Sequence, residues 1–254
     1  MNGQMYQICF IAAATKKVLN TKKIISYVPL KYENRVDFQF LSRSKLFFQK
    51  TVESIEEWYV HCLEKGLQDI KLIAPIAVDD RMLLGFSNET QSSLVCFWEG
   101  KVTYFTAKWE FDSAKKMWNV LYIEQKWENA PSGKPHFENN AESFKAILIK
   151  IRELAYKLDS AYFAEVFQRA FDILSGIADC KEAVYDMPIL DILKENLCLF
   201  QAASIADVFG AMGSWNDSPP CIAHEKGLSE EYDSLSGELL KQIRLALLYA
   251  INEW

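Results

Sequence analysis

The side chains with the clearest potential for chemistry fall within nine residues near the end of the chain: Asp217, Cys221, His224 and Glu225. Cys221 and His224 are three residues apart, so a helical turn would place them on the same face. A thiolate beside an imidazole can act as a nucleophile with its general base, and a carboxylate such as Asp217 can orient the imidazole. This group supports one hypothesis, a hydrolase or transferase with its site on the 210–225 loop.

The same side chains could supply two or three ligands to a metal ion, but a structural zinc site needs four. The other Cys/His pair, His61 and Cys62, is adjacent in the sequence, so the two side chains would point to different helix faces and could not easily share a metal. Cys–His pairs of known hydrolases come from distant segments rather than from one turn. It also lacks a Gly-rich phosphate loop, a dinucleotide-binding fingerprint, a G-x-S-x-G elbow and an H-E-x-x-H helix. We therefore predict no metal and no cofactor. Cys221, His224 and Asp217 remain catalytic candidates without a supporting motif.

The segment that holds this group, residues 205–227, has the composition of a long connection between helices. Its two glycines permit positive φ, and its two adjacent prolines prevent a helix from continuing through it. We predict a binding surface on this connection, made of residues Trp215, Asn216, Asp217 and Ser218. Two interpretations of the tryptophan stay open: an anchor packed between helices, or part of the contact surface.

The composition indicates a folded protein with an acidic surface. Hydrophobic residues make up 50% of the chain and charged residues 24%, and the net charge is −6 with a pI of about 5.3. Phosphate backbones need clustered Lys and Arg, so no nucleic-acid partner is predicted. Negative charge suits a basic protein partner instead. We therefore favour an interaction protein without catalytic activity, which restrains a basic partner such as a nucleic-acid-acting enzyme. The oligomeric state is left open.

The six cysteines indicate a reducing compartment. None is arranged as Cys-x-x-Cys, and most lie within apolar runs, where a cysteine behaves as a small buried hydrophobe. The apolar patch at residues 8–14 lacks the basic flank of a signal peptide and is too short to cross a bilayer. We therefore expect a cytoplasmic location and no membrane association.

Residues 1–130 have the pattern of a β-rich region. Three runs, at 93–99, 101–111 and 117–127, are separated by turn residues and alternate apolar with polar side chains, which predicts an antiparallel meander with one covered face. One helix is expected in this region, capped by Thr51 and ended by Gly66. Shorter strands are expected at residues 6–12, 24–28, 36–40, 69–75 and 81–86.

A tryptophan recurs about once per strand in this meander, at Trp98, Trp109, Trp118 and Trp127. An exposed row of such rings could stack on sugars or bases, which is the second alternative function. The other interpretation is that these rings anchor the sheet against its helices. Trp109 shares its strand face with Phe105, which favours anchoring.

After the segment 130–135, which holds two prolines, a glycine and a serine, the sequence is helical. Helices are expected at about 144–158, at about 163–174, from a cap at Asp186, and from a cap at Ser229. The last of these has apolar residues over a wide surface, so we expect it at the centre of a bundle of about four helices. The predicted fold class is α+β, with an N-terminal antiparallel sheet and one helix over residues 1–130. A C-terminal helical bundle covers residues 136–254, and the two parts could act as one integrated unit.

Overall fold

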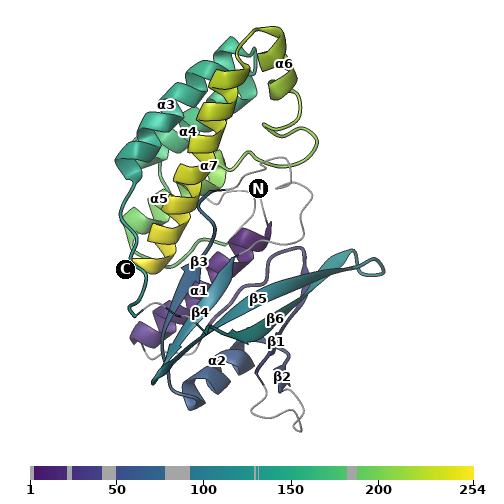
Figure 1. Cartoon of the computed structure of the whole chain (residues 1–254), viewed down its shortest axis with the longest axis vertical. Coiled ribbons are helices and arrows are strands. Elements are labelled where there is room, and N and C mark those ends of the chain that lie inside the picture. The colour runs from purple at the N-terminus through teal and green to yellow at the C-terminus, as the bar shows by residue number, and fades with distance from the viewer. Residues whose placement is uncertain are drawn as a thin grey trace. The chain divides into compact units, whose positions relative to one another are not determined.

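The structure, a computed structural model, describes residues 3–21, 25–41, 50–77, 92–128, 130, 132–181 and 188–254. Contacts between Cα atoms divide the chain into two compact units. The sheet unit is formed by residues 4–74 with the described part of 88–135, and the helical unit is formed mainly by residues 136–254. The strands and helices of both units are labelled in Figure 1.

The sheet unit is built on six strands in the order β2-β1-β6-β5-β4-β3. Every neighbouring pair is antiparallel except β1 and β6, which run parallel, so the sheet is mixed rather than purely antiparallel. The α+β class, with a β-rich part followed by helices, is confirmed. The strands are β1 (Glu33–Gln39), β2 (Thr51–Val52), β3 (Leu67–Ile73), β4 (Ser93–Trp98), β5 (Lys101–Asp112) and β6 (Met117–Lys126).

The predicted meander of three strands is confirmed as β4, β5 and β6. The turn between β4 and β5 contains Gly100, whose φ of +68° lies in the left-handed region that glycine adopts at low cost. The second turn follows Asp112, which pairs with Met117 across the hairpin. The Asp112 carboxylate accepts a hydrogen bond of 3.0 Å from the backbone N–H of Ala114, which stabilises this turn.

The prediction of a strand at residues 6–12 is wrong, because these residues belong to a helix, α1 (Gly3–Thr21). Every side chain from Met5 to Ala13 is buried. A helix that is buried on nearly all sides has no polar face, so its sequence lacks the 3.6-residue alternation that marks an amphipathic helix. The sheet unit therefore has two helices among its described residues rather than the one expected.

The second helix of this unit, α2 (Ile55–Glu64), starts slightly later than predicted. Its cap is Ser54, whose Oγ accepts a 3.1 Å hydrogen bond from the Glu57 N–H, whereas Thr51 lies in β2. Gly66 follows the helix with a φ of +80°, as expected for a terminating glycine. Of the shorter strands, those at 36–40 and 69–75 correspond to β1 and β3. The described residues 25–28 have no regular structure, and 81–86 lies outside the described residues.

Both helices cover the same face of the sheet. On β1, Phe38 stacks on Trp58 of α2 and on Tyr122 of β6, with ring centroids 4.6 and 5.0 Å apart. The Tyr122 hydroxyl donates a 3.0 Å hydrogen bond to Oε1 of Gln7 on α1. All four side chains are fully buried. The core of the sheet unit therefore lies between this face and the two helices.

The described residues of the helical unit form four longer helices and one short one. The predictions at 144–158, 163–174 and from Ser229 are confirmed, whereas the helix expected from Asp186 begins only at Lys194. Residues 188–193 are not helical, and Asp186 lies outside the described residues. Among the described helices, none is both long and apolar enough to cross a membrane. The helices are α3 (Ala141–Lys157), α4 (Ala161–Leu174), α5 (Lys194–Ala206), α6 (Pro219–Glu225) and α7 (Ser229–Asn252).

The last helix, α7, packs against α3, α5 and α6. Leu239, Ile243 and Ala246 are buried on one stripe, and Leu240 and Leu247 are buried beside it. The wide apolar surface that the sequence shows is thus covered within the helical unit, as expected for the central helix of a bundle.

Candidate functional site

Trp215 fastens the connection between α5 and α7 to the bundle, and its side chain is fully buried. Its Nε1 donates a 2.8 Å hydrogen bond to the Ser236 hydroxyl, and its carbonyl accepts one of 2.7 Å from the Tyr232 hydroxyl, both on α7. The rings of Phe163 and Phe167 on α4 lie edge-on to the indole, with centroids 5.2 and 5.4 Å away. Trp215 is therefore an anchor, and its side chain offers no exposed surface to a partner.

Local hydrogen bonds shape the tip of this connection. Gly213 has a φ of +78°, and its N–H donates a 2.7 Å hydrogen bond to the Asp217 carboxylate. The Ser214 hydroxyl accepts one from the backbone N–H of Asn216 at 3.2 Å, and Asn216 is itself buried. Of the four predicted binding residues, only Asp217 and Ser218 are exposed. One Asp217 oxygen already caps the turn, so this carboxylate has a structural role as well.

Cys221 and His224 lie on α6, a short helix that the sequence analysis did not predict. Both side chains are exposed. Within the described part of the chain, no hydrogen bond joins either of them to Asp217. No group of three or more His, Cys, Asp or Glu side chains among the described residues is placed to hold a metal ion. The structure places the thiol and the imidazole on one short helix but does not assemble them into a triad with the carboxylate.

Exposed apolar side chains surround the anchored connection. The Tyr162 ring is 5.3 Å from that of Phe163, which in turn contacts Trp215, yet Tyr162 is 65% exposed. Met212, at the tip of the connection, is 93% exposed. We call this surface the loop end of the bundle. Its exposed residues are Tyr156, Asp159, Tyr162, Glu165, Met212, Asp217, Ser218, Glu225 and Glu230.

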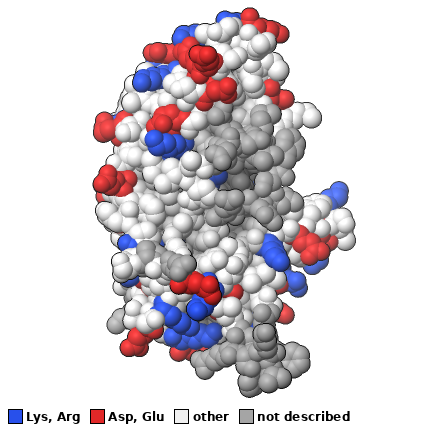
Figure 2. All heavy atoms as spheres, in the orientation of Figure 1, with Lys and Arg blue, Asp and Glu red and all other residues white. Residues whose placement is uncertain are grey.

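The negative charge of the chain belongs to the helical part. Residues 136–254 contain 19 Asp and Glu against 10 Lys and Arg, a formal charge of −9. Residues 1–135 contain 15 acidic and 18 basic residues, a formal charge of +3. Acidic side chains are frequent on the visible face of the bundle near α6 (Figure 2). The excess of negative charge is therefore a property of the helical part and not of the whole chain.

Some acids at the loop end are neutralised and others are not. Lys157 pairs with Glu231 at 2.7 Å, and Lys226 pairs with Asp159. Glu165, Glu225 and Glu230 are exposed and have no cationic partner among the described residues. The loop end thus keeps a local excess of negative charge.

The four tryptophans of the meander do not form one exposed row. Trp98 is buried, and its Nε1 donates a 2.8 Å hydrogen bond to the Thr103 hydroxyl. Trp109 and Trp118 are half-buried, with ring centroids 6.1 Å apart, towards the outer end of the β5–β6 hairpin. Trp127 lies beside Tyr104, on the face away from α1 and α2. Stacking along a row of four rings is therefore excluded by the geometry.

A buried carboxyl group that the sequence pattern did not reveal is Glu33 of β1. The Tyr27 hydroxyl donates to this carboxylate and lies 2.8 and 2.9 Å from its two oxygens. Burial raises the pKa of Glu33, and the hydrogen bond from Tyr27 offsets part of that rise. Burial also raises the pKa of Tyr27 and Tyr32, with a further rise from the charge of Glu33. No residue spacing signals this cluster, because the pairing of β1 with β6 encloses it.

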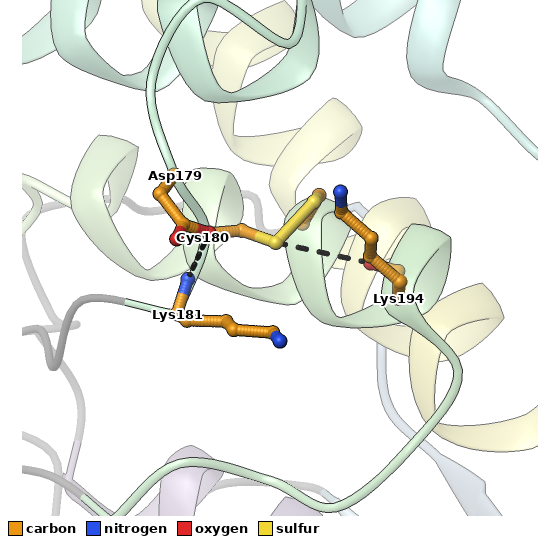
Figure 3. The surroundings of a disulfide bond; sticks show 5 residues. Asp179, Cys180, Lys181 and Lys194 are labelled. Atoms are coloured by element: carbon orange, nitrogen blue, oxygen red, sulfur yellow. Dashed lines mark hydrogen bonds between the residues drawn. A yellow bond between two sulfur atoms is a disulfide. The ribbon is translucent and has the colours of Figure 1, made fainter.

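One pair of cysteines contradicts the expectation of reduced, buried thiols. Cys180, after α4, and Cys198, on α5, form a disulfide, and Cys180 Sγ lies 3.9 Å from the Lys194 carbonyl oxygen (Figure 3). Disulfides persist in oxidising compartments, so the argument for a reducing compartment loses support from this pair. The cytoplasmic location remains a prediction.

The cysteines of the sheet unit behave as the sequence suggested. Cys9, Cys62 and Cys96 are free and buried. Burial raises the pKa of Cys62 and Cys96 well above the usual value, so both remain thiols at neutral pH. Neither is therefore a nucleophile, which leaves Cys221 as the exposed free thiol of the described residues.

Comparison with known proteins assigns no family to this arrangement: no protein-family model, no curated protein and no solved structure matches the chain. The function must therefore be argued from the residues of the site.

Proposed function

We propose that the chain is an interaction protein that binds a basic protein through the loop end of its helical unit. The observation that supports this is the charge of −9 on residues 136–254, with exposed and unpaired Glu165, Glu225 and Glu230 beside exposed Tyr162 and Met212. Interfaces combine a few apolar or aromatic contacts with a charged rim that selects and orients the partner. The loop end has both components.

The rigidity of the connection favours binding. The hydrogen bonds of Trp215 to Ser236 and Tyr232 hold the connection in one conformation before a partner arrives. A surface that is already ordered loses little conformational entropy on association, so more of the contact energy appears as affinity. Met212 adds an adaptable side chain, because its unbranched thioether can fit partners of different shapes.

The charge indicates the class of partner. A protein surface that binds phosphate backbones carries clustered Lys and Arg, and an acidic surface complements such a cluster. A nucleic-acid-acting enzyme restrained at its basic surface is therefore the partner we propose. This interaction needs no catalytic residue from the chain, so exposed Cys221 and His224 have no role in it.

The test is capture of partners from a lysate of the source organism with wild-type protein and with the Tyr162→Ala/Glu165→Lys double variant. Calorimetric titration of the purified partner then follows at two salt concentrations. We expect a basic protein in stoichiometric amount, with affinity that falls with added salt and at least about tenfold in the double variant.

Glu138→Lys is the matched control, because it makes the same charge change at an exposed residue before α3, at the other end of that helix. The proposal is wrong if the control weakens binding as much as the double variant does, or if no basic protein is retained at low salt. Cys221→Ala/His224→Ala should bind normally. An activity lost in this last variant, with binding unchanged, would instead support the hydrolase or transferase hypothesis.

A further inference from the structure

A hollow of about 360 Å³ lies on the sheet face away from α1 and α2. It is bordered by side chains from neighbouring strands, among them Ser93, Val95, Tyr104 and Trp127. Val95 pairs with Tyr104 across β4 and β5, which places their side chains on the same face. A volume of this size is at the lower end of the roughly 300–1,000 Å³ of ligand sites, so it suits a small ligand.

Two aromatic rings form a corner in this hollow. The Tyr104 and Trp127 ring centroids are 6.1 Å apart, and the ring planes are 78° from each other. The Tyr104 hydroxyl donates a 2.9 Å hydrogen bond to Gln125 Oε1, and Gln125 Nε2 donates one of 2.7 Å to the Thr106 hydroxyl. These bonds fix the orientation of the tyrosine ring and occupy its hydroxyl, so the ring itself is what it presents to a ligand.

The polar side chains that face the hollow are a carboxylate and a hydroxyl. Glu128 borders the hollow and is exposed, and Ser93 borders it from β4. No hydrogen bond or ion pair within the described residues occupies either side chain. Lys126 also borders the hollow, but it pairs with Thr103, whose side chain lies on the face that α1 and α2 cover, so the Lys126 side chain points to that face. Glu128 therefore offers an acceptor, and Ser93 offers a hydroxyl that both donates and accepts.

We propose that this hollow binds a neutral saccharide, with one pyranose ring stacked on Trp127. A pyranose ring has an apolar face of C–H bonds that packs on an aromatic ring, and hydroxyls at its edge that both donate and accept hydrogen bonds. Glu128 accepts from two neighbouring hydroxyls, and the Ser93 hydroxyl donates to another. Tyr104 closes the corner against the apolar edge of the sugar.

The same residues disfavour other small ligands. A phosphate group would meet the Glu128 carboxylate, with no cationic side chain of the described residues facing it in the hollow. A planar base is held best between parallel rings, whereas Tyr104 and Trp127 are nearly perpendicular. A neutral polyol uses the aromatic face, the carboxylate and the hydroxyl.

The test is ¹⁹F NMR of protein labelled with 5-fluorotryptophan, which gives one signal for each of the seven tryptophans. The signal of Trp127 is assigned by its loss in Trp127→Phe. The probes are the methyl glycosides of glucose, mannose and galactose, N-acetylglucosamine, and linear trisaccharides of the same sugars. We expect a saturable shift of the Trp127 signal with at least one saccharide, while the signal of buried Trp215 stays in place.

The trisaccharides show whether the natural ligand is a free sugar or one residue of a glycan chain. Tighter binding than the matching methyl glycoside indicates a glycan chain, and equal binding indicates a free sugar. Glu128→Gln and Ser93→Ala remove these polar groups and leave the sheet intact, so each should weaken binding of the same saccharide about tenfold without moving the unliganded spectrum of Trp215. Trp118→Phe, on the opposite face, should leave the affinity unchanged.

Choline, adenosine monophosphate and phenylalanine serve as probes for a cation, a nucleotide and a zwitterion. The proposal is overturned if the Trp127 signal responds saturably to one of these and to no saccharide, or if it responds to none of the probes. Equal affinity of wild-type and Glu128→Gln protein for every saccharide would also overturn it.

Discussion

Trp215 in the helical unit and Trp58 in the sheet unit are both fully buried, but their polar edges have different surroundings. Trp215 Nε1 donates to Ser236, and the backbone of the same residue accepts from Tyr232. Trp58 stacks on Phe38 at 4.6 Å, and its Nε1 has no hydrogen-bond partner among the described residues. Hydrogen bonds have directions, whereas stacked rings can slide. The helical unit therefore uses its tryptophan to fix one loop conformation, and the sheet unit uses its own mainly to fill volume.

The largest effect is expected from Trp215→Ala. Removing the indole leaves a cavity between α4 and α7 and unpairs Ser236, so the free energy of unfolding should fall by about 4 kcal/mol. Urea denaturation followed by far-UV circular dichroism measures this loss. A loss below about 1 kcal/mol would show that the anchor is not needed for the bundle.

The disulfide gives the next largest effect and separates the two units. Cys180 and Cys198 are 18 residues apart, and opening a loop of that length is expected to cost about 3 kcal/mol. Cys198→Ser should lower the stability of the helical unit by this amount, as should reduction of the wild-type protein. Hydrogen exchange should show the loss in α4 and α5 and not in β4–β6. Equal loss in both units would contradict the division into separate units.

A direct test of the comparison replaces each buried tryptophan by phenylalanine. Trp215→Phe loses a hydrogen bond and leaves the buried Ser236 hydroxyl unpaired, so it should cost about 1–2 kcal/mol more than Trp58→Phe. Adding Ser236→Ala to Trp215→Phe removes the unpaired group and should recover part of that difference. Chemical denaturation of the four proteins checks both statements. Equal costs for the two single variants would remove the contrast between the tryptophans.

The smallest effect concerns Glu33 in the sheet unit, and it appears as a dependence on pH. Its folded pKa is raised by burial, so the folded state holds this proton more tightly than the unfolded chain does. The resulting stability is fully present below the unfolded pKa of about 4.5 and is lost as pH rises through the folded pKa. Glu33→Gln should reduce this decline in a series of urea midpoints. Some decline should remain, because the pKa of Asp37 is raised as well. An unchanged decline in the variant would show that Glu33 does not titrate in this way.

The strands and helices that could be predicted correctly from the sequence are those whose pattern of side chains lies within one continuous segment. The β4–β6 meander follows from alternation of side chains and a glycine turn, and α3, α4 and α7 follow from apolar stripes. The helix α1 could not be recognised in this way, because residues 5–13 are buried on every side and show no alternation. The mixed sheet could not be predicted either, since the parallel pairing of Val36 with Val120 joins segments far apart in the chain.

The sequence predicted which segment holds the candidate site, but not the role of each residue in it. The composition of residues 205–227 indicated an unusual connection, but the role of Trp215 depends on Phe163 and Ser236, which come from other helices. The hollow beside Trp127 likewise depends on the register of three strands rather than on spacing. The disulfide had no signal, because Cys180 and Cys198 meet only when α5 folds back against α4.

The parallel pair of β1 and β6 has a consequence for how the chain folds during synthesis. Asn34 and Asn119, whose side chains are hydrogen-bonded between these strands, are 85 residues apart. At about 5–20 residues per second, a ribosome needs roughly 4 to 17 s to make the segment between them. Throughout that time the apolar surface of α1 and the ring of Phe38 lack the strand that covers them. The sheet unit therefore stays incomplete for that time, whereas α3 and α4 can pair as soon as both have emerged.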